Sequence, residues 1–173
     1  MPNMPPVHEL EFLRQSNNHL ELDRKLALLG MANPVLQDYA QFVCRAWFGL
    51  GLAHLSEANA LLVANCSRAT YSRAYYAAYN ASKAVRYIAN GFVSLKGDDH
   101  GKASADLPGD FPDLNKWASD ITNLYAHRLR ADYDNWSDTN QLFTLLPPAA
   151  VQLASDFLSV SKTYIHGKTG MLL

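Results

Sequence analysis

The sequence lacks the features that mark secreted, membrane-spanning or disulfide-stapled proteins. It has only two cysteines, Cys44 and Cys66, with no Cys-x-x-Cys pair and no Cys/His cluster, so we expect reduced thiols. The N-terminus has neither the basic start nor the apolar run of a signal peptide, and no later window is apolar for long enough to span a membrane. These absences predict a cytoplasmic protein with no membrane segment.

An excess of charge of either sign is also missing. The 173 residues carry a formal net charge of -1, with 49% hydrophobic and 18% charged residues, which is typical of one globular domain with its own core. Because the chain is not basic overall, binding to nucleic acid would require a local patch of cations.

The common catalytic motifs are absent. We find no GxGxxG, P-loop, HExxH or GxSxG sequence, and no ExxH pair of the kind that holds two metals in helical bundles. The nearest approach to a ligand set is Asp98-Asp99-His100, which has no second group of ligands to complete it. The sequence therefore predicts no metal site and no cofactor.

The apolar spacing is helical throughout, and no strand pattern competes with it. Gly49 and Gly51 are positions at which one long helix would bend or split, and the polar stretch 92–112 is typical of a long loop. We predict an all-α, up-and-down four-helix bundle with an N-terminal helical extension, divided into residues 1–44, 45–167 and a tail, 168–173. The expected helices cover 7–30, 34–64 after Asn33 as cap, 67–90 with Ser67 as cap and Gly91 as stop, 114–125 after Asp113, a possible turn at 141–145, and 147–167 from Pro147-Pro148.

The stretch 69–91 has two different faces. Alanines and three tyrosines at four-residue spacing form faces suited to packing against other helices, and no Asp or Glu occurs between Cys66 and Asn90. A separate polar stripe is either an ordinary solvated face or one wall of a binding groove. It consists of Arg73, Tyr76, Asn80 and Lys83.

A second polar cluster lies near the end of the next long helix, at 126–136. Arg128 and Asp132 are four residues apart, as are Arg130 and Asp134. Two ion pairs that stabilise an exposed helix end are therefore a sufficient explanation of this cluster. The functional alternative places the arginines, with Tyr133 and His127, opposite the first stripe. Arginines bind phosphates, tyrosines stack on bases, and a histidine transfers protons near neutral pH.

Several separated segments resemble one family. SRAYYAAYNASKA, at 72–84, is similar to the second core helix of the HEPN superfamily, and most similar to stand-alone bacterial members whose helix reads SRAYYAAFHAAKA. Asp99-His100-Gly101 falls where those members have a Thr-His pair, and LRADYD, at 129–134, resembles their RxxADYD segment. The resemblance covers about residues 46–165 and implies a HEPN bundle that forms a homodimer.

The resemblance supports the fold more than the family's metal-independent ribonuclease activity. Active members carry an Arg-x4-6-His motif, whereas Asp132 stands near the position expected for the histidine here. An aspartate is ionised at pH 7, so it donates no proton and repels a phosphate. The candidates for catalysis are His127, Arg128 and His100. The candidate residues for RNA or nucleotide binding are Arg73, Tyr76, Asn80, Lys83, Arg128, Arg130, Asp132 and Tyr133.

Three functions remain open at this point. The first is a HEPN module that binds RNA, a nucleotide or a protein through the polar cleft; the resemblance implies a toxin-antitoxin or stress-defence context with an antitoxin or nucleotidyltransferase partner. The second is an endoribonuclease that uses His127 or His100 in place of the missing histidine. The third is an interaction bundle without a nucleic-acid role, in which the alanine-rich face serves self-association.

Overall fold

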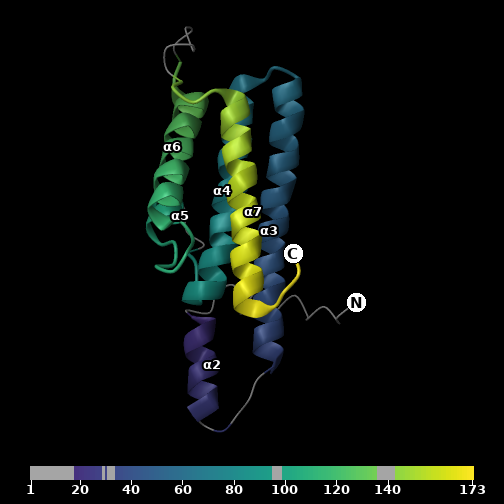
Figure 1. The fold of residues 1–173 in the computed structure, drawn as a ribbon, viewed down its shortest axis with the longest axis vertical. Helices are drawn as coiled ribbons and strands as arrows, with labels where there is room; N and C mark the ends of the chain where they lie inside the picture. Colours follow the sequence, from purple (N-terminus) through teal and green to yellow (C-terminus); the bar gives the residue numbers. More distant parts are fainter. Residues whose placement is uncertain (1–17, 29, 31–33, 95–98, 136–142) are drawn as a thin grey trace.

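The protein is described by a computed structural model that covers residues 18–28, 30, 34–94, 99–135 and 143–173. All regular structure in these residues is helical, which confirms the predicted all-α class. The described residues form six helices, drawn in Figure 1: α2 (His19–Leu28), α3 (Pro34–Val63), α4 (Ser67–Asn90), α5 (Asp99–Ala105), α6 (Leu114–Tyr133) and α7 (Pro147–Thr169).

Helix α4 is the centre of the bundle. It packs against α3 and α7 on one side and against α6 and the short α5 on the other, while α2 projects beyond one end of the long helices (Figure 1). The four long helices, with α2 before them, agree with the predicted bundle and N-terminal extension. The division at residue 44 falls inside α3 and stays a prediction.

The central position of α4 follows from its small side chains. Five of its seven alanines are fully buried and let neighbouring helices approach closely; they are Ala74, Ala77, Ala78, Ala81 and Ala84. Gly51 of α3 lies so close that an added Cβ would be 3.0 Å from the carbonyl oxygen of Ala77. Gly51 therefore permits helix contact. The glycines do not split α3, which runs unbroken from Pro34 to Val63.

The helix ends confirm most of the predicted signals. Gly91 ends α4 with φ of 84°, and its N–H donates to the carbonyl of Tyr87, as a left-handed glycine cap requires. Helix α7 begins at Pro147 as predicted but passes Gly167 and ends before Gly170. Ser67 is the first residue of helix α4, so Cys66 rather than Ser67 stands at the cap position. Asp113 precedes α6 without a side-chain cap hydrogen bond.

Two elements differ from the sequence expectation. Residues 99–105 form helix α5 within the stretch expected to be a loop, and 143–145 are not helical. Helix α2 begins after Asn18, whose side-chain oxygen accepts hydrogen bonds from the N–H groups of Leu20 and Glu21. The predicted helix over 7–17, the Asn33 cap and the start of the turn at 141–145 lie outside the described residues. No helix in the described ranges has both the length and the apolar character needed to cross a membrane.

Candidate functional site

Tyr76, half-buried on α4, is surrounded by two histidines and an arginine from three other helices. Its ring centroid lies 5.6 Å from that of His54 on α3 and 6.0 Å from that of His100 on α5. The guanidinium of Arg128 on α6 lies 5.5 Å from the ring. We call His54, Tyr76, His100, Arg128 and Tyr133 the Tyr76 cluster. The cluster joins the two polar segments singled out in the sequence.

Arg128 is held on three sides. Its Nη2 donates to the Tyr76 hydroxyl at 3.0 Å, and its carbon Cζ lies 5.3 Å from the Tyr133 ring centroid. Its Nε lies 2.8 Å from Asp132 Oδ2, but this N–H is not aligned for a hydrogen bond, so the attraction is Coulombic. Burial by itself would lower the pKa of Arg128, and the Tyr76 and Asp132 interactions outweigh it and raise that pKa. The guanidinium is therefore a fixed positive charge.

His100 is a neutral histidine stacked among tyrosines. Its ring stacks on Tyr79 at 4.7 Å and on Tyr125 at 5.6 Å, and its Nδ1 lies 2.8 Å from the Tyr75 hydroxyl. Burial, reinforced by the charge of Arg128, lowers its pKa. Burial also raises the pKa of Tyr75, which keeps its proton. Within the described ranges, Nε2 of His100 has no hydrogen-bond partner, so this nitrogen is available to a ligand.

A buried ion pair places His100 in the cluster. Both carboxylate oxygens of Asp99 accept hydrogen bonds from Arg86, at 2.9 and 2.8 Å. The side chains of Arg86 and Asp99 are 2% and 0% exposed, so the pair is fully desolvated. Lys83 adds a third contact, with Nζ 3.8 Å from Asp99 Oδ2. Because Asp99 begins α5, this pairing fixes the helix that carries His100 onto α4.

His127 is placed away from the Tyr76 cluster. It is 1% exposed, and its Nδ1 donates to the carbonyl of Asn123 at 2.9 Å. The backbone N–H of Leu145 donates to its Nε2 at 3.1 Å, so the ring is the neutral tautomer with a proton on Nδ1. Nδ1 is bonded within α6, and Nε2 ties residues 144–145 to that helix, which leaves neither nitrogen for a substrate.

The other predicted binding residues lie in different surroundings. Arg73 turns toward α3, where its Nε is 3.1 Å from Glu57 Oε2 and its Nη1 is 3.3 Å from His54 Nδ1. Asn80 is buried, and its amide donates to the Tyr76 carbonyl at 2.8 Å. Lys83 packs over the Tyr79 ring beside α5. The structure therefore joins Arg73 to the cluster only through His54 and places Asn80 in the interior.

The sequence reasoning missed His54 and the role of its neighbour Glu57. Glu57 is the only full charge between Ala46 and Ala64, and His54 precedes it by nearly one helical turn. These two polar groups, one turn apart on an otherwise apolar helix, are the feature from which the sequence could have indicated a polar contact on this helix. Their meeting with Arg73 depends on the antiparallel packing of α3 on α4.

No protein-family model, curated protein or solved structure matches this chain significantly. The described part of the chain contains no group of three or more histidine, cysteine, aspartate or glutamate side chains placed to hold a metal ion. The chemistry available at the Tyr76 cluster is thus that of one fixed guanidinium, the imidazoles of His54 and His100, and two tyrosine rings.

Proposed function

We propose that this chain is a HEPN-type bundle that binds single-stranded RNA at the Tyr76 cluster. The observation that carries the proposal is Arg128, a fixed cation that lies over the rings of Tyr76 and Tyr133. An arginine binds phosphate oxygens through two parallel N–H groups, and an exposed tyrosine offers a face on which a base stacks. Tyr133 is 71% exposed, so its ring is accessible.

The charge balance of the cluster sets the expected strength of binding. Arg128 is paired with Asp132 and Arg73 with Glu57, so the surface is close to neutral rather than strongly basic. Affinity should therefore depend more on stacking than on counterion release. Arg130 is exposed on α6, two residues after Arg128. We expect Arg73, Arg128 and Arg130 each to contact one phosphate, so the slope of log K against log salt should be about -2, at about -0.7 for each phosphate contacted.

Site-directed variants test this proposal in a fluorescence-anisotropy titration with a short single-stranded RNA. Tyr133→Ala should weaken binding by about five- to 150-fold, since one base–aromatic stack contributes about 1–3 kcal/mol. Arg128→Ala should also weaken it, whereas Arg45→Ala, an exposed arginine on α3, is the matched control. Equal affinities for the Arg128 and Arg45 variants would exclude the cluster as the binding site.

His100 favours a second candidate function, metal-independent RNA cleavage. Its lowered pKa keeps it neutral at pH 7. In the tautomer whose Nδ1–H donates to the Tyr75 hydroxyl, its Nε2 would accept the proton of a ribose 2′-hydroxyl. The 2′-oxygen would attack the adjacent phosphorus, forming a 2′,3′-cyclic phosphate while the P–O5′ bond breaks. The 5′-oxygen would leave with a proton from water, and Arg128 would stabilise the charge on the phosphate.

The cleavage hypothesis has a direct assay. Purified protein should cut RNA in the presence of EDTA, and His100→Ala should abolish the cutting while circular dichroism shows an intact bundle. Tyr75→Phe should shift the pH profile because it removes the hydroxyl that contacts His100 Nδ1. If wild-type protein binds RNA but leaves it intact across neutral pH, the protein is a binding module without this activity.

A further inference from the structure

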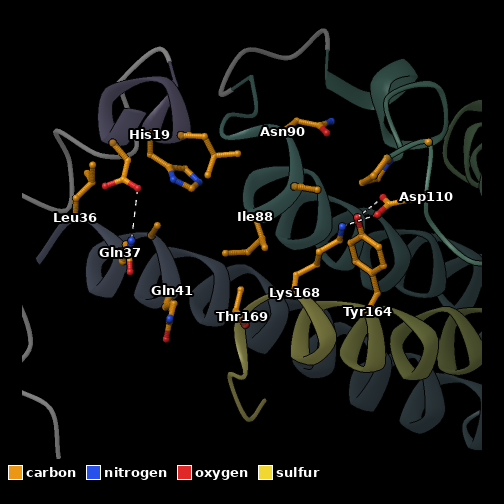
Figure 2. Close-up of a pocket in the computed structure, with 16 residues that line it drawn as sticks. His19, Leu36, Gln37, Gln41, Ile88, Asn90, Asp110, Tyr164, Lys168 and Thr169 are labelled. Atoms are coloured by element: carbon orange, nitrogen blue, oxygen red, sulfur yellow. Dashed lines mark hydrogen bonds and ion pairs between the residues drawn. The ribbon is translucent and has the colours of Figure 1, made fainter. Parts of the chain in front are cut away.

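An open cavity lies at the opposite end of α4 from the Tyr76 cluster. A cavity of about 550 Å³ is enclosed by α2, the first turns of α3, the ends of α4 and α7 and the segment 108–110 (Figure 2). Ile88, in its wall, follows Tyr76 by twelve residues, or about 18 Å along a helix. The volume is in the range of small-molecule sites, and neither RNA binding nor cleavage uses this cavity.

One part of the wall is apolar and suits the body of an organic molecule. Leu36 and Ala40 of α3 and Ile88 of α4 provide this surface, and Figure 2 shows Leu36 and Ile88 beside the cavity. Gln37 and Gln41 lie on the same helix as Leu36, with Gln41 one turn after Gln37, and add amide groups. In the described structure the Gln41 amide has no hydrogen-bond partner, so it is available to a ligand.

The charged side chains of the lining are two carboxylates and one ammonium group. Asp23 and Asp110 each contribute a carboxylate, and Lys168 is the single ammonium among the lining residues, paired with Asp110. Asp110 also accepts a hydrogen bond from Tyr164 at 2.7 Å, and the Lys168 contact, followed by that of Tyr164, lowers its pKa, so it is an anion at neutral pH. After the Asp110–Lys168 pair is set aside, Asp23 leaves the cavity with an excess negative charge.

His19 adds a buried acceptor. It is 5% exposed, and its Nε2 lies 2.7 Å from the carbonyl of Tyr87, an acceptor, so Nε2 carries the proton and Nδ1 keeps a lone pair. Burial lowers its pKa, which keeps the ring neutral. The C-terminal ends of α4 and α7, at Asn90 and Thr169, also line the cavity, and helix C-termini carry partial negative charge. The first turns of α2 and α3 present the opposite dipole ends to the cavity, so its net charge comes from the side chains.

We propose that this cavity binds a small organic cation, an amine or amidine on an apolar body. The cation would lie toward Asp23 and the body against Leu36 and Ile88, with the glutamine amides fixing its orientation. An organic anion of the same size would meet the excess carboxylate of Asp23, so the site should discriminate by charge.

Three probes of one shape test the proposal: benzamidine, benzamide and benzoate, which are cationic, neutral and anionic. In NMR titrations of the full chain, benzamidine should shift the backbone amide signals of Gln41 and Ile88 saturably. Benzamide and benzoate should bind at least about tenfold more weakly, since they lack the charge-assisted contact. Equal binding by benzamide or benzoate, or no saturable shift with millimolar benzamidine, would overturn the proposal.

A substitution of Asp23 tests whether the bound cation lies beside this carboxylate. Asp23→Asn should weaken benzamidine binding by about three- to tenfold, the loss expected for one partly exposed charge-assisted contact. Asp156→Asn, on an exposed part of α7, is the matched control. An Asp23 variant that folds and binds like the Asp156 control would contradict the assignment. Arg128→Ala should leave benzamidine binding unchanged, so this site and the RNA site can fail separately.

Discussion

Replacing Asp99 with asparagine removes one charge from the ion pair that holds α5 on α4. The substitution keeps the shape of the side chain but leaves the Arg86 guanidinium, 2% exposed, without its counter-charge. Breaking a buried pair in this way costs about 3–5 kcal/mol, and we expect the lower end, about 3 kcal/mol, because the amide oxygen still accepts one hydrogen bond. For a chain of this size that corresponds to a fall in Tm of about 6–12 °C.

Urea denaturation followed by circular dichroism measures this loss as a lower midpoint with an unchanged m-value. The double variant Arg86→Met/Asp99→Leu is the control, because replacing both charges with apolar groups should recover most of the stability. A loss below about 1 kcal/mol for Asp99→Asn, or simply additive effects in the double variant, would refute the description of the pair as buried and coupled.

Three further outcomes follow from the burial of single groups. Because burial lowers the pKa of His19 and of His100, each histidine stays neutral in the folded protein and becomes protonated in the unfolded chain. The free energy of unfolding should therefore fall as the pH drops below about 6.5. Its dependence on pH should be shallower in His100→Asn. Burial raises the pKa of Cys44 to about 12, so a thiol reagent should label only exposed Cys66 in the native protein and both cysteines in urea. Gly51→Ala should destabilise the protein by about 1–3 kcal/mol in the same urea assay, because the new Cβ meets backbone of α4.

The main helices could be predicted because local signals and periodicity act within each segment. Gly91 and Pro147 set helix ends that the structure confirms, and the alanine spacing of α4 identified the helix that becomes the centre of the bundle. Helix α5 was missed because four of its seven residues are polar and Gly101 lies among them, so local propensity favoured a loop. A long-range ion pair with Arg86, rather than local spacing, holds this helix in place.

The candidate site was predictable only in part for the same reason. Arg128 and Tyr76 meet because two polar stripes on neighbouring helices face each other, which spacing suggested. His54 and the orientation of Arg73 depend on how α3 packs on α4, and the burial of Asn80 depends on helices that cover α4 from both sides. Such contacts are made between helices, so they cannot be predicted from the sequence of one helix by itself.

The salt dependence of single-stranded RNA binding tests the central claim most directly. Wild-type protein should show a slope of log K against log salt of about -2, and Arg128→Ala should reduce its magnitude by about 0.7, the contribution of one phosphate contact, while Arg45→Ala leaves it unchanged. Identical slopes for wild type and Arg128→Ala, or no binding to RNA at low salt, would contradict the assignment of the Tyr76 cluster as an RNA site.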